Sequence, residues 1–211
     1  MKIEWKKTEK EIYLPGKNPE VVQIPKMKYF AISGTGNPNH EDFQEKITVL
    51  YGLAYAVRMM PKSGYTPPGY EEYTVYPLEG IWDLTEAGRQ AKGESLLLDK
   101  DQLVYKIMIR QPDFVTDEVF RTAFKKVEKK LPAQLLAQAS FEELEDGLCV
   151  QMMHIGSFDN EPESFAKMDE FLAVHGLVRK SKVHKEIYLS DFRKTKPEDL
   201  KTVLRYFVKK G

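Results

Sequence analysis

Glu186 is the residue of this chain best suited to acid–base or cation-binding chemistry. Its surroundings read His184-Lys185-Glu186-Ile187-Tyr188-Leu189, and this composition predicts a β-strand over residues 182–190. Side chains alternate along a strand, so Glu186 shares one face with His184 and Tyr188, while Ile187 and Leu189 occupy the other. We expect the apolar pair to face the covering helices and Glu186 to face away from them.

A carboxylate among aromatic side chains has two chemical uses. It can bind a cation, or it can act as a general acid or base, because an apolar environment raises the pKa of a carboxyl group. The alternative is a structural role, either as a solvated strand residue or as the ion-pair partner of Lys106 or Lys185. Spacing alone leaves these three interpretations open.

Aromatic residues supply the candidate walls of a binding site around Glu186. The chain has 11 Tyr, 11 Phe and 2 Trp, and tyrosine combines an apolar ring with a polar tip that suits a wet pocket. Aromatic residues also favour strands, which is the alternative explanation. Tyr55, on a helical pattern over residues 41–59, is the candidate catalytic partner of Glu186. The predicted ligand-binding residues are Tyr76, Trp82, Met108, Met152 and Tyr188.

The elements that would position these residues form a weak internal repeat. Strand-to-helix segments are predicted at 103–126 and again at 186–206. A second pair of segments places a Gly turn and an acidic helix start after Ala31-Ile32-Ser33-Gly34 and after Met153-His154-Ile155-Gly156. We therefore expect one α+β domain over residues 1–211, with duplicated strand-helix-strand units at about 20–126 and 147–210. Two such units pack about a pseudo-twofold axis and leave a central groove.

Composition excludes several classes of protein. Lys plus Arg and Asp plus Glu both number 32, which argues against nucleic acid as a partner. No run of 18 apolar residues predicts a membrane span, and the N-terminus lacks a secretory signal. The lone Cys149 excludes a disulfide framework and fits the cytoplasm. The four histidines are scattered, so we expect no metal, and no phosphate-binding loop predicts another cofactor.

Three ordered motifs resemble a known family. The first is a strand, Val150 to Phe158, that contains His154-Ile155-Gly156; the second is a helix that closes with His175-Gly176-Leu177; the third is the strand that contains Glu186-Ile187-Tyr188-Leu189. Together they resemble the GyrI-like small-molecule-binding domain. The segment Tyr73 to Trp82 is similar to the stand-alone branch of that family. The resemblance covers about residues 20–210.

The resemblance implies a function for Glu186. In this family a duplicated βαββ unit encloses a groove, and a buried Glu among aromatics receives bulky cationic drugs in some AraC- and MerR-type regulators. Some stand-alone members resemble hydrolases that open the cyclopropane of DNA-alkylating natural products. The chain shows no helix-turn-helix, and its insertion at residues 65–93 would cover the groove. We therefore expect a protein that binds apolar or cationic aromatic small molecules, with hydrolysis of cyclopropane-bearing genotoxins favoured and non-catalytic multidrug binding, sequestration or sensing as the alternative.

Overall fold

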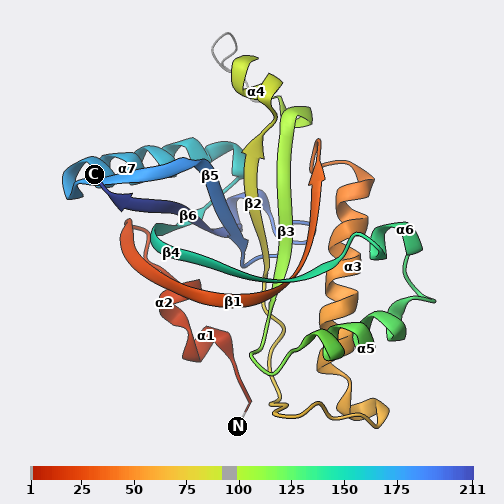
Figure 1. Cartoon of the computed structure of the whole chain (residues 1–211). Helices are drawn as coiled ribbons and strands as arrows, with labels where there is room; N and C mark the ends of the chain where they lie inside the picture. The colour runs from red at the N-terminus through yellow and green to blue at the C-terminus, as the bar shows by residue number, and fades with distance from the viewer. Residues whose placement is uncertain (1, 92–98) are drawn as a thin grey trace. The chain divides into compact units, whose positions relative to one another are not determined.

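The computed structural model describes residues 2–91 and 99–211, and it has the predicted α+β fold (Figure 1). The first half contains α1 (Trp5–Thr8), α2 (Lys10–Tyr13), β1 (Glu20–Thr35), α3 (Glu41–Arg58), β2 (Leu78–Leu84), α4 (Glu86–Ala91) and β3 (Leu103–Gln111). Two helices follow, α5 (Asp117–Val127) and α6 (Ala133–Leu136). The second half contains β4 (Ser140–Ile155), α7 (Glu161–His175), β5 (Leu177–Tyr188) and β6 (Lys201–Lys210). Short 3-10 turns occupy Pro61–Ser63, Lys100–Gln102, Phe158–Asn160 and Pro197–Asp199.

The chain forms two compact units whose boundaries fall inside strands. The first unit consists of residues 1–3, 27–76 and 82–144. The second consists of residues 4–26, 77–81 and 145–211. Strands β1, β2 and β4 each contribute residues to both units.

Each half of the chain repeats the order strand, helix, strand, strand. In the first half β3 is hydrogen-bonded between β1 and β2, and in the second half β6 is hydrogen-bonded between β4 and β5. The pairs β1–β3, β4–β6 and β5–β6 are antiparallel. The Gly turns that follow β1 and β4 both lead into helices, as the sequence predicts. The pseudo-twofold axis and the central groove stay predictions.

The predicted match between residues 103–126 and 186–206 is wrong. Residues 103–127 form a strand and a helix, but residues 197–208, predicted as a helix, form a short 3-10 turn and most of strand β6 (Lys201–Lys210). Residues 202–206 are all buried, so both faces of β6 are covered. A strand buried on both faces has no polar alternation, and periodicity cannot distinguish it from a buried helix. The structural counterpart of β3 is therefore β6, and α5 has no counterpart after β6.

Helix α7 covers one face of β4 and β6 in the second unit. Its residues Met168 and Leu172 join Val150, Met152 and Leu204 in a buried apolar cluster. The helix ends at Gly176, which has a φ of 62° and donates its N–H to Leu172. Glycine adopts this left-handed conformation without a steric penalty, so it ends the helix where the sequence predicts.

The N-terminal segment that contains α1 and α2 belongs to the second unit, where hydrogen bonds hold it against β4 and β6. Met153 donates its backbone N–H to Gly16 (2.8 Å), Gln151 donates to the carbonyl of Glu11 (2.7 Å), and Arg205 donates to the carbonyl of Ile12 (2.7 Å). Tyr13 is completely buried. These contacts make the N-terminal segment an ordered part of the core of the second unit.

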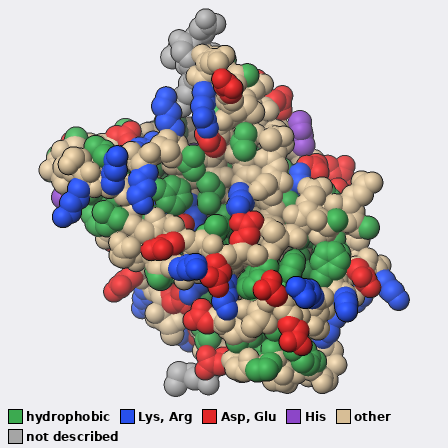
Figure 2. Space-filling model, in the orientation of Figure 1, with side chains coloured by type: hydrophobic (Ala, Val, Ile, Leu, Met, Phe, Trp, Pro, Cys, Tyr) green, Lys and Arg blue, Asp and Glu red, His purple; other side chains and the backbone are tan. Residues whose placement is uncertain are grey.

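The charges are interspersed over the face of the molecule seen in Figure 2, in line with the zero net charge. Among the described residues, no helix is both long and apolar enough to cross a membrane.

Candidate functional site

Glu186 lies near the end of β5, held by its two neighbours on the same face of the strand. His184 Nε2 lies 2.9 Å from Oε1, and the Tyr188 hydroxyl donates to Oε2 at 2.7 Å. The Glu186 side chain retains 11% of its exposure. The parity argument therefore grouped these three residues correctly, and Glu186 pairs with neither of the lysines proposed as structural partners. Lys106 pairs with Glu142 at 2.6 Å.

A β-bulge sets the register of this part of β5. The pairing with β6 shifts between Arg179 and His184, after which His184 lies opposite Tyr206 and Glu186 opposite Leu204. The Arg179 guanidinium donates to the carbonyls of Ser181 (3.2 Å) and Lys182 (2.6 Å). These bonds give the carbonyls of the interrupted ladder a hydrogen-bond partner. The bulge itself changes the direction in which the following side chains of the strand point.

Aromatic rings border both neighbours of Glu186. Tyr188 has its ring centroid 6.0 Å from that of Phe158 and 6.4 Å from that of Phe192. Phe158 and Phe192 also meet edge to face at 6.3 Å. On the other side, the Phe165 ring contacts His184 edge-on at 5.0 Å. Glu186 is thus bracketed by rings from β5, from α7 and from the loops that precede α7 and follow β5.

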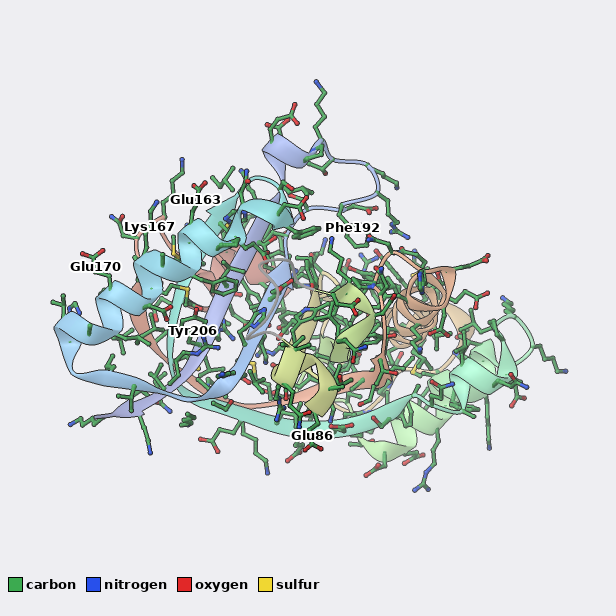
Figure 3. All side chains as sticks on the ribbon, turned by 90° about the horizontal axis from the view of Figure 1, so that it is seen from above. Glu86, Glu163, Lys167, Glu170, Phe192 and Tyr206 are labelled. Carbon is green, nitrogen blue, oxygen red and sulfur yellow. The ribbon has the colours of Figure 1, made fainter. Side chains whose placement is uncertain are left out.

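The ring of Phe165, which contacts His184, is itself stacked on Tyr206 of β6. The ring of Phe165 is parallel to that of Tyr206, with centroids 5.4 Å apart and planes 3° apart. The Arg179 guanidinium lies 3.7 Å from the Tyr206 centroid, a cation–π distance. In Figure 3 Glu163, Lys167 and Glu170 follow the outer side of α7, Tyr206 lies on the side towards the strands, and Phe192 lies near the N-terminal end of the helix.

The predicted facing of β5 is the reverse of the observed one. We expected Ile187 and Leu189 to face the helices, but Phe165 of α7 packs on the His184 face, which carries Glu186. The opposite face of β5 carries Lys185 and Ile187, both completely buried. The reason is that β5 is buried on both faces over Lys185–Ile187, so apolar side chains do not identify the helix-covered face there.

The face of β5 opposite Glu186 carries a buried ionic cluster. Lys185 Nζ lies 2.7 Å from Asp146 and 3.2 Å from Glu79. Arg205 lies 3.1 Å from Asp146 and donates to Gln151 Oε1 at 2.8 Å. All five side chains are at most 5% exposed. This network of alternating charges was not predicted, because a lysine and an arginine in strand segments usually indicate solvent-facing positions.

The His154-Ile155-Gly156 motif has a structural role in this chain. His154 is buried, with Nδ1 2.9 Å from the Ser164 hydroxyl and Nε2 3.0 Å from the carbonyl of Ser157. Gly156 has a φ of 133°, which favours glycine. The motif therefore joins β4 to the start of α7 and fixes the turn that carries Phe158.

Of the other predicted site residues, Met152 lies on the Glu186 face, because Leu204 pairs with both. Trp82 belongs to the first unit, where its ring lies 5.5 Å from that of Tyr105. Met108 lies three positions from Tyr105 in a regular ladder, so the two side chains face opposite sides of β3.

Two further tyrosines lie in the first unit. Tyr76 is buried beneath the Arg110 guanidinium, which lies 4.6 Å from its ring. Tyr55 on α3 keeps 48% of its exposure and lies 6.3 Å from the Tyr51 ring. The catalytic role of Tyr55 and the ligand-binding roles of Tyr76, Trp82, Met108, Met152 and Tyr188 stay predictions.

Two residues of the site were not predicted from the sequence. Phe158 and Phe192 lie in the connections before α7 and after β5, where no periodicity indicates the direction of a side chain. Their position in the chain could have indicated a place near Glu186. Phe192 follows the predicted strand that contains Glu186, and Phe158 follows the predicted strand that contains His154.

A family model for the GyrI-like small molecule binding domain matches residues 17–208. The chain belongs to the GyrI-like family. The match covers both βαββ halves, including the strand that carries Glu186 and the His154 turn. Family membership therefore agrees with the resemblance drawn from the sequence motifs.

Solved structures from Listeria innocua share the GyrI-like fold over the full chain. A protein described as a hydrolase is 34% identical, with a TM-score of 0.87 and coverage of 98% of this chain and 100% of its own. A second hydrolase is 36% identical, with a TM-score of 0.88 and coverage of 99% and 100%. An uncharacterized conserved protein is 37% identical, with a TM-score of 0.88 and coverage of 98% and 100%. A search of curated protein sequences finds no significant match.

Proposed function

We propose that this GyrI-like protein hydrolyses bulky aromatic small molecules that carry a strained cyclopropane, with Glu186 as general base. The observation that carries the proposal is a nearly buried carboxylate held between two hydrogen-bond donors and bordered by rings. Small-molecule sites commonly combine apolar walls with a few fixed polar groups. The hydrolase descriptions of the two Listeria innocua relatives support the same class of activity.

The proposed reaction is the addition of one water molecule. The water oxygen attacks a cyclopropane carbon while Glu186 accepts the proton that water loses. The cleaved carbon–carbon bond gives its electron pair to a conjugated dienone, whose oxygen becomes a phenolate and is then protonated. Tyr55 is the proposed donor of that proton. Strain and conjugation already activate such a ring, so one positioned base contributes a useful part of the rate.

Three aromatic side chains suit the proposed substrate. Phe158, Phe192 and Tyr188 form a cluster of mutually perpendicular or tilted rings next to the carboxylate. Edge-to-face and offset arrangements are the favourable geometries of aromatic pairs, so flat substrates would join the cluster without displacing it. The predicted ligand-binding roles of Tyr76, Trp82, Met108 and Met152 are part of the same proposal.

A non-catalytic role is the second candidate, and the same cluster motivates it. A carboxylate beside aromatic rings also recognises organic cations, through charge attraction and cation–π contact. In that role the protein would bind, sequester or sense cationic drugs without changing them. Cytoplasmic location and the absence of a nucleic-acid partner remain part of both proposals.

One substitution with two assays separates the candidates. Glu186→Gln keeps the shape of the side chain and removes its charge. A catalytic Glu186 predicts that turnover of a cyclopropane-bearing alkylator, followed as the water adduct by mass spectrometry, falls ~10²–10⁴-fold with neutral-ligand binding preserved. A cation receptor predicts unchanged neutral binding and a loss of about 1–3 kcal/mol for tetraphenylphosphonium.

The matched control is Glu170→Gln on the exposed side of α7, which should behave as the wild type in both assays. A wild-type protein that retains the alkylator in a one-to-one ratio without releasing adduct would refute hydrolysis. An effect of Glu170→Gln equal to that of Glu186→Gln would refute the assignment of the site.

A further inference from the structure

We propose that His184 is a positioning residue for Glu186: its imidazole fixes the orientation of the carboxylate by donating Nε2–H to Oε1. This inference rests on the proposed function and adds a second residue to the same site. An ionised carboxylate only accepts hydrogen bonds, so at 2.9 Å the proton of the contact belongs to Nε2 of His184.

The carboxylate is held from both directions along the strand. His184 precedes Glu186 by two positions and Tyr188 follows it by two, and each engages a different oxygen, Oε1 at 2.9 Å and Oε2 at 2.7 Å. Either bond alone would leave the carboxylate free to rotate about its terminal torsion. Together they fix its plane, and each oxygen keeps a lone pair for a water molecule or a ligand cation.

The imidazole of His184 is itself held in place. Phe165 of α7 contacts its ring edge-on at 5.0 Å, and the ring of Tyr206 opposite it on β6 stacks on Phe165. The charged groups near this pair are Arg179, over the Tyr206 ring, and Asp169, whose negative charge contributes to raising the pKa of the Tyr206 hydroxyl after the larger effect of burial. His184 therefore couples the packing of α7 to the position of the base.

The kinetic consequence follows from orientation. A base that can rotate away from its water loses effective concentration, and small misplacements of catalytic groups cost up to ~10²-fold in rate. Substrate binding through aromatic walls does not depend on this hydrogen bond. Loss of the donor should therefore lower kcat and leave KM for a neutral substrate nearly unchanged.

Two variants distinguish the donor from the ring. His184→Phe keeps a ring against Phe165 and removes the N–H, and it should lower kcat ~10–100-fold with KM within about threefold. His184→Gln restores an N–H donor and should recover most of the lost kcat. The matched control is His175→Phe, at the exposed end of α7, where the imidazole stacks on Phe171; it should retain wild-type kcat. Wild-type kcat in His184→Phe, or no recovery in His184→Gln, would overturn the inference.

A spectroscopic measurement decides the inference even without turnover. The ¹⁵N signals of His184 should show the proton on Nε2 in the wild type, and Glu186→Gln should shift the Nε2 signal while leaving that of His175 unchanged. If no cyclopropane substrate is turned over, the proposed function fails alone. If the Nε2 signal of His184 is the same in wild type and Glu186→Gln, the positioning role fails, whatever the activity.

Discussion

Replacement of Lys185 by Met should destabilise the protein strongly, because it breaks a buried cluster whose charges sum to zero. Lys185 is completely buried between Asp146 and Glu79, at 2.7 and 3.2 Å. Without it, Arg205 alone faces two buried carboxylates. Removal of one partner from a buried ion pair costs about 3–5 kcal/mol, since a charge remains without compensation. Met preserves most of the apolar stem, so lost volume contributes little.

The measurement is urea unfolding followed by circular dichroism. A loss of 3–5 kcal/mol corresponds to a midpoint lower by at least ~1 M at usual urea dependences. A second substitution, Glu79→Gln in the Lys185→Met background, removes the surplus charge and should bring stability back to within ~2 kcal/mol of the wild type.

The matched control is Lys194→Met, at a lysine whose side chain is 81% exposed and 3.8 Å from Asp191. An exposed pair of this kind contributes between about 0 and 1 kcal/mol. The reasoning would be refuted by a Lys185→Met protein as stable as Lys194→Met. It would also be refuted if the double variant were less stable than Lys185→Met alone.

Two further predictions concern Asp146 of this cluster and the neighbouring Cys149, whose thiol lies 3.7 Å from the Asp146 carbonyl. Burial by itself would raise the pKa of Asp146, but the charges and hydrogen bonds of Lys185 and Arg205 outweigh it and hold this pKa below its ordinary value. The ionised form therefore stabilises the fold above the unfolded pKa of about 3.9, and this stability is lost as pH falls through the lower folded pKa. Asp146→Asn should be less stable at pH 7 and lose less stability than the wild type on acidification, whereas parallel urea–pH curves would contradict the assignment. Burial also raises the pKa of the Cys149 thiol to about 11, against the opposing charge of Arg205, so iodoacetamide at pH 8 should modify this thiol only in urea; rapid modification of the native protein would show that the thiol is accessible.

Much of the secondary structure could be predicted because local signals agreed with tertiary packing. Helices α3 and α7 follow apolar residues at helical spacing, and Pro61 and Gly176 end their patterns. The error at β6 has a physical origin in its central position. A strand that has neighbouring strands on both sides and is covered on both faces contains a continuous run of buried residues, which periodicity cannot distinguish from a helix. In addition, the preceding Pro197 is a residue type common at the first position of a helix.

The candidate site was also predicted in part: the residues that share a face were correct, and the direction of that face was wrong. Strand parity brought His184, Glu186 and Tyr188 together, since alternation holds wherever a strand is regular. The choice of face failed because Lys185, which looks solvent-facing in the sequence, is neutralised inside the core by Asp146 and Glu79. This neutralisation of charge could not be predicted from the sequence, because Lys185 and Glu79 lie more than one hundred positions apart.

The docking of the N-terminal segment has a consequence for protein synthesis. Arg205 of β6 donates to the carbonyl of Ile12 across 193 positions, and the second unit is assembled from residues 4–26, 77–81 and 145–211. On the ribosome, where segments emerge in order, all residues of the first unit have been translated once residue 144 is reached. Residues 4–26 can complete their contacts only after β6 has been synthesised, because Trp5 and Tyr13 are buried only in the folded second unit. The nascent chain therefore completes the fold around Glu186 last, with its earliest residues among the final ones to become ordered.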